Sequence, residues 1–99
     1  MTDIIAIMDQ NRAQTIALQA LTFLVGDERA FAGFLAASGM DRASLAVGAQ
    51  NPAVLGGVLD FVMQSDGHLL AFCAHANVTP DSARRARQAL PGAPPAWSP

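Results

Sequence analysis

The sequence has little charge and no lysine. Only 14% of its 99 residues are charged, and all six basic residues are arginine. The net charge of −2 gives no broad attraction to nucleic acid or to anionic lipid. Apolar residues make up 52% of the chain, so the composition is that of a globular protein with a lightly charged surface.

Cysteine is nearly absent, and so are the features that direct a chain to a membrane. The single cysteine, Cys73, excludes an internal disulfide and fits a reducing compartment. The N-terminal stretch carries aspartate where a secretory signal needs lysine or arginine, and its apolar run is too short for one. No apolar stretch approaches the roughly 20 residues that span a bilayer. We therefore expect a soluble, cytoplasmic protein without membrane association.

The sequence also lacks the common motifs of catalysis. It contains no Gly-rich phosphate loop, no serine nucleophile motif and no paired acid constellation. Most carboxylates lie at expected helix starts, where capping and the helix dipole explain them. Asp60 lies in mid-helix on the expected exposed face, and we interpret it as a solvated surface acid. We expect no enzymatic activity, no catalytic residue and no cofactor.

One expected helix carries residue types that bind metals. His68 and His75 share a face of it, but about 10 Å separates them along the helix axis, with Phe72 between them. Cys73 points to another face, where a lone cysteine usually acts as a small hydrophobe. We therefore expect neither a metal site nor Cys–His catalysis.

The clearest helix start is Asn51-Pro52, because asparagine caps a first turn and proline is favoured at the first helical position. The apolar residues that follow form one broad helical stripe. Gly56 and Gly57 lie inside this helix, where each costs about 1 kcal/mol relative to alanine. We expect another helix to cross closely at these glycines.

Caps and apolar spacing predict the other helices in the same way. A first helix, capped by Thr2 or Asp3, runs to about Val25 unless it breaks near Asn11. The others span residues 28–38, 42 to about 49, 52 to about 64, 66 or 67 to 76, and 80 to 89 or 90. The apolar residues of 66–76 expected to face inward are Leu69, Leu70, Phe72, Cys73 and Ala76.

The chain resembles itself at an offset of 38 residues. Residues 20–44 align without a gap on residues 58–82, and Phe23 falls on Phe61 and Phe34 on Phe72. The alignment predicts two related three-helix units, about 12–49 and 51–89, that bury their apolar faces on one another. Chance similarity between amphipathic helix pairs is the alternative.

These observations predict an all-α fold, a compact bundle of five or six short helices. We expect residues 1–90 to form a single helical domain. Residues 91–99 contain four of the chain's six prolines and are expected to be a disordered, Pro-rich tail.

Four segments, ALTFLVGD, FLAASGMD, VLDFVMQSD and LLAFC, are followed by a short helix ending in ALPG. With this spacing the chain resembles a small bacterial family catalogued as domain of unknown function 3572. The resemblance covers about residues 17–92 and leaves out Trp97 and most of the tail. It implies a compact all-helical domain and supplies no established activity, cofactor or catalytic residue.

Protein association is the function that we favour from the sequence. Weakly charged helical units with broad apolar stripes leave apolar surface for an unknown protein partner or for a homodimer. The residues that we single out for such contacts are Ile4, Ile5, Ile7, Met8 and Trp97. For the N-terminal four, closing the core is the alternative that we slightly favour.

Helix-turn-helix-like binding of nucleic acid is the alternative. FLAASGMDRASL has the shape of such a motif, but its second helix offers few polar side chains to base edges. The 80–89 helix carries half of the chain's basic residues, and its candidate contacts are Arg84, Arg85, Arg87 and Gln88. Cations late in a helix also complement its dipole, and Asp81 is placed to pair with Arg84 or Arg85.

Overall fold

The structure of the chain is a computed structural model that describes residues 9–91. These residues form six helices and contain no strand, so the expected all-α fold is confirmed. No helix within residues 9–91 has the length and apolar character needed to cross a bilayer. The helices are α2 (Gln10–Val25), α3 (Glu28–Ser38), α4 (Arg42–Gly48), α5 (Pro52–Met63), α6 (Asp66–Ala76) and α7 (Pro80–Ala89). The candidate contacts Ile4, Ile5, Ile7, Met8 and Trp97 lie outside the described residues, as does most of the 91–99 tail.

The expected capping residues set the helix bounds. Asp27, Asp41 and Thr79 each accept a hydrogen bond from a first-turn backbone N–H, at the starts of α3, α4 and α7. Gly39 and Asn77 end α3 and α6 with φ angles of 75° and 58°, the left-handed conformation expected at helix ends.

The helix that ends at Val25 begins at Gln10. Asp9 has an extended backbone, with φ −89° and ψ 173°, and its carboxylate accepts the N–H of Arg12. An uninterrupted helix from Thr2 or Asp3 to Val25 is therefore wrong, because the chain is not helical at Asp9, close to the alternative break near Asn11. The physical reason is that a capping carboxylate satisfies the first-turn amides that a continuing helix would otherwise bond.

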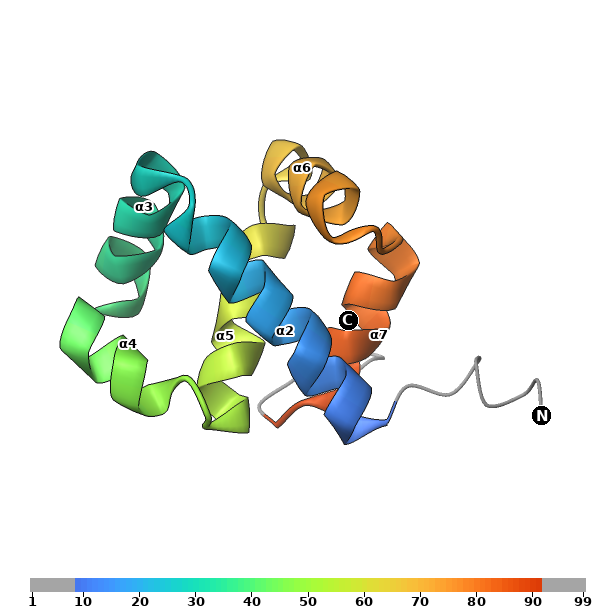
Figure 1. Ribbon diagram of the computed structural model, residues 1–99, viewed down its shortest axis with the longest axis horizontal. Helices are drawn as coiled ribbons and strands as arrows, with labels where there is room; N and C mark the ends of the chain where they lie inside the picture. Colours follow the sequence, from blue (N-terminus) through green and yellow to red (C-terminus); the bar gives the residue numbers. More distant parts are fainter. Residues whose placement is uncertain (1–8, 92–99) are drawn as a thin grey trace, which may run out of the picture.

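α2 and α5 lie at the centre of the molecule, with α3 and α4 on one side and α6 and α7 on the other (Figure 1). α2 packs most extensively on α5 and α7. The largest fully buried side chains come from α2, α5 and α6 and are Ile16, Leu24, Leu55, Val58, Leu59, Val62 and Phe72.

One apolar residue of α6 does not face inward. Leu69, Phe72 and Cys73 are buried, but Leu70 is 60% exposed. The expectation that Leu70 packs in the core is wrong, because consecutive helical residues point about 100° apart. Once Leu69 and Phe72 face α2 and α5, Leu70 is left on the solvent side.

Helix bounds recur at the 38-residue offset. α3 and α6 have the same length, α2 and α5 end at Val25 and Met63, and α4 and α7 begin at Arg42 and Pro80. The two third helices pack differently, because α7 lies against α2 and α5 whereas Leu45 is the only buried residue of α4. The internal duplication stays a prediction, since these bounds follow from the same capping residues that suggested it.

Candidate functional site

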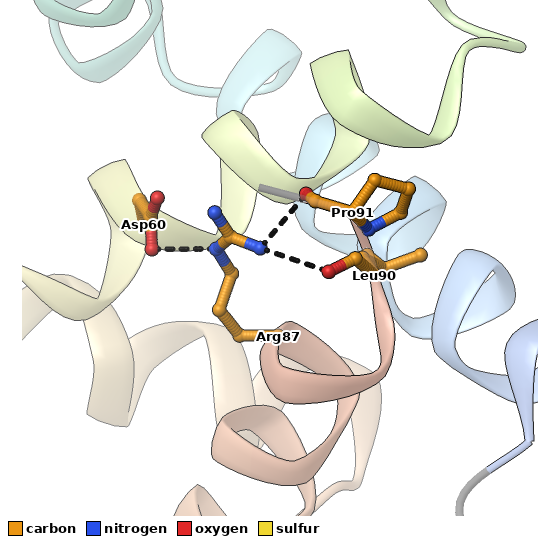
Figure 2. Close-up of polar contacts among 4 residues, drawn as sticks. All are labelled: Asp60, Arg87, Leu90 and Pro91. Carbon is orange, nitrogen blue, oxygen red and sulfur yellow. Dashed lines mark hydrogen bonds and ion pairs between the residues drawn. The ribbon is translucent and has the colours of Figure 1, made fainter. Parts of the chain in front are cut away.

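An ion pair joins α7 to α5. Nε of Arg87 donates a hydrogen bond of 2.7 Å to Oδ1 of Asp60, and Nη1 points to the backbone oxygens of Leu90 and Pro91 at 3.4 and 3.3 Å (Figure 2). The Arg87 side chain is 6% exposed and that of Asp60 is 42% exposed. The guanidinium therefore anchors the end of α7 on α5, while the carboxylate reaches the surface.

Gly56 makes room for this guanidinium. A Cβ atom on Gly56 would lie 2.8 Å from Nη1 of Arg87 and 3.2 Å from the oxygen of Pro91. Gly56 and Asp60 are one helical turn apart, so the bare backbone and the acid lie on the same face of α5. The only signal of this site in the sequence is a glycine one turn before a mid-helix acid, and it does not identify the arginine that fills the space.

Two sequence interpretations change as a result. A side chain and a carbonyl approach Gly56 closely, whereas the expected contact was a crossing helix. Asp60 is partly exposed, as expected of a surface acid, but it is also the partner of a buried cation. The periodicity of α5 placed the acid at the edge of the buried face and gave no information about which residue meets it there.

A groove lies between α3 and α5, close to this ion pair. Its volume is about 320 Å³, at the small end of the roughly 300–1,000 Å³ typical of ligand pockets. Phe34 and Phe61 pack edge to face within its lining, with ring centroids 5.6 Å apart. The lining residues are Phe34, Ala37, Ser38, Met40, Ala53, Val54, Gly57, Asp60, Phe61 and Gln64. Asp60 is the only charged residue among them, so the groove is apolar with an acid in its wall.

Gly57 has no packing role within the described part of the fold. A Cβ atom placed on it would have no heavy atom of another group within 4 Å, so alanine fits there without strain. Glycine at this position nevertheless weakens α5 by about 1 kcal/mol relative to alanine. Unlike at Gly56, no contact in the described fold explains why residue 57 is a glycine. Gly57 lines the groove between α3 and α5.

A second groove, between α2 and α6, is more polar. Its volume is about 340 Å³, and the residues that line it are Thr15, Leu18, Gln19, Thr22, His75 and Ala76. The hydroxyls of Thr15 and Thr22 donate to the backbone oxygens of Asn11 and Leu18 one turn earlier, so they are already used within α2. This groove has less apolar lining than the α3–α5 groove and no position that folding leaves unexplained.

The histidines and the cysteine of α6 do not converge. His68 packs against Phe61 and His75 against Phe23, each with ring centroids 5.9 Å apart. Cys73 is buried, and this burial raises the pKa of its thiol, an effect that the nearby charge of Arg84 partly offsets. Within residues 9–91, no three side chains of His, Cys, Asp or Glu gather as a metal site requires.

The four candidate nucleic-acid contacts lie on two faces of α7. Arg84, Arg85 and Gln88 are exposed, and Arg85 forms an ion pair of 3.0 Å with Asp81 one turn earlier. Arg87 points the other way, into the core. The structure therefore does not bring the four together on one surface, because the inward face of α7 runs through Ala83, Ala86 and Arg87.

Comparison with known proteins gives one match. The profile of a family described as protein of unknown function, DUF3572, matches residues 10–93, which include all six helices described above. No curated protein and no solved structure matches the chain. The chain therefore belongs to the DUF3572 family, which confirms the resemblance seen in the sequence.

Proposed function

We propose that the protein is a non-catalytic, cytoplasmic protein-interaction module that binds its partner in the groove between α3 and α5. The observation that carries the proposal is Gly57, a glycine inside a helix that no contact within the described fold requires. Positions that disagree with local folding preferences tend to mark functional sites. A bare backbone at the groove surface gives a partner close access to α5.

The lining of the groove supports this function. Met40, Val54 and Phe61 offer partly buried apolar surface, and polar side-chain atoms are confined to Ser38, Asp60 and Gln64. An apolar centre with a few polar groups at the edge is the usual anatomy of a protein interface. Catalysis has less support, because the one acid in the lining is held by Arg87 and has no second titratable lining residue beside it.

The nucleic-acid alternative also has less support. It needs several cations on one face, whereas Arg87 is committed to Asp60 and Arg85 pairs with Asp81. α4, the second helix of the helix-turn-helix-like segment, exposes Arg42 and Ser44 at its start and then only apolar side chains such as Ala46 and Val47, so it offers few hydrogen-bonding groups to base edges.

Photocrosslinking tests the proposal in the cells from which the protein comes. The crosslinker p-benzoylphenylalanine is introduced at Ala37, an exposed position of the groove, and at Ala74, an exposed position of α6, as the control. We expect a discrete protein adduct from Ala37 that resists nuclease, is absent from Ala74 and is lost when Gly57→Gln is added. Equal adducts from both positions, or an Ala37 adduct that persists in Gly57→Gln, would contradict the proposal.

A further inference from the structure

We infer that the occupant of the α3–α5 groove is an amphipathic α-helix of a partner protein that carries a basic residue facing Asp60. This inference rests on the proposed function and specifies the partner's chemistry. It follows from the shape of the groove, from the bare backbone at Gly57 and from the charge in the groove wall.

The walls of the groove favour a helical occupant. Both walls are helices, and residues 9–91 contain no strand edge on which an extended peptide could add a strand. Polyproline ligands dock in aromatic-lined grooves, but the aromatic rings here belong to Phe34 and Phe61, which have no polar group to bond a peptide carbonyl. The remaining common mode is a helix that lays an apolar face into a hydrophobic groove.

Gly57 sets how closely such a helix approaches. A small residue at a helix contact lets two backbones come nearer than side chains otherwise permit, as small residues do between packed helices. Ala53 precedes Gly57 by one turn and also lines the groove. A volume of about 320 Å³ accommodates a few apolar side chains, which suits one stripe of a short helix.

Asp60 determines the sign of the partner's charge. The side chain of Asp60 is 42% exposed, whereas the side chain of its partner Arg87 is 6% exposed. Figure 2 shows one hydrogen bond to this carboxylate, from Arg87 to Oδ1, and none to its second oxygen. An approaching helix therefore meets a fixed carboxylate and not the buried cation, which favours lysine or arginine over an acid at that point.

The experiment is a selection from a phage library of helical peptides on the immobilised full-length chain. Binders are counter-selected on the Gly57→Gln chain, so that only groove-dependent sequences remain. The best binder is then synthesised with its basic residue unchanged and with that residue replaced by glutamate. Changing the peptide leaves the Asp60–Arg87 pair intact, which a substitution of Asp60 does not.

We expect the enriched sequences to repeat apolar residues at helical spacing and to contain a lysine or arginine on one edge of that stripe. Replacing this cation by glutamate should weaken binding, measured by fluorescence anisotropy, by about fivefold, the upper range for an exposed ion pair. Circular dichroism should show helix formation in the bound peptide.

Three outcomes would overturn the inference while leaving the proposed function intact. These are enrichment of proline-rich or extended sequences, equal affinity of the cationic and acidic peptides, and a homodimer that Gly57→Gln dissociates, which would make a second copy the occupant. If no binder depends on Gly57 and the Ala37 crosslinker also gives no adduct, the inference and the proposed function fail together.

Discussion

Asp60 and Arg87 are 27 residues apart in the chain, yet they share a 2.7 Å hydrogen bond that joins α5 to α7. The bond fixes the wall of the α3–α5 groove, because the same carboxylate lines that groove. Charge and shape at the candidate site therefore depend on a contact made by the last described helix.

Removing the charge of Asp60 should destabilise the fold. Asp60→Asn leaves the buried guanidinium of Arg87 without an anionic partner, and we expect the free energy of unfolding to fall by about 1–3 kcal/mol. Urea denaturation measures it. The matched control is Asp66→Asn, at the exposed start of α6, where about 0.3–1 kcal/mol is expected from the helix dipole. A loss no larger than that of the control would show that the pair contributes little.

The two adjacent glycines of α5 should respond to alanine in opposite ways. Gly57→Ala enters open space, and we expect it to raise the free energy of unfolding by about 0.4–1 kcal/mol. Gly56→Ala gains the same helix propensity but meets Arg87 and Pro91, and overpacking of this kind costs about 1–3 kcal/mol. Chemical denaturation of both variants gives the difference between their free energies of unfolding, in which the gain in helix propensity that both variants share cancels. Equal effects would mean that the Arg87 side chain moves aside freely.

Asp41 should contribute a pH-dependent part of the stability. Hydrogen bonds from the backbone N–H and then the hydroxyl of Ser44 lower the pKa of Asp41 below its ordinary value of 3.8. Because the unfolded chain then binds the proton more readily, this contribution is present above 3.8 and is lost as the pH falls through the folded pKa.

An NMR titration of the Asp41 side-chain carbon should therefore show a midpoint below 3.8. The control variant is Asp41→Asn, because asparagine caps a helix comparably but does not titrate. As the pH falls, the Asp41→Asn chain should become more stable relative to the wild type. A midpoint at or above 3.8 would contradict the prediction.

Substitution of two of the four candidate residues tests the nucleic-acid alternative without disturbing the core. Arg84 and Arg85 are exposed, so Arg84→Ala with Arg85→Ala should leave the fold intact, whereas Arg87→Ala removes a buried anchor. We expect no binding to mixed-sequence DNA or RNA at low salt by either the wild type or the double variant. Salt-sensitive binding by the wild type that the double variant loses would instead favour the alternative.

The sequence by itself determined where most of the helices begin and end, although not that α2 begins at Gln10. Asp27, Asp41, Asn51 and Thr79 cap their helices through hydrogen bonds to amides two or three residues away, and Gly39 ends α3 through its own backbone. Such signals act over one helical turn, so they can be recognised without knowing the rest of the fold. The apolar spacing likewise predicted most of the core.

Only the tertiary structure decided which surfaces meet. Arg87 looks like a surface cation in α7, and Gly56 and Gly57 look alike in α5, until the packing of α7 on α5 buries the guanidinium over one glycine and leaves the other open. The groove likewise combines residues of α3 and α5 that no local pattern connects. Helical periodicity fixes which side chains share a face, whereas the partner of each face follows from the packing of helices distant in the chain.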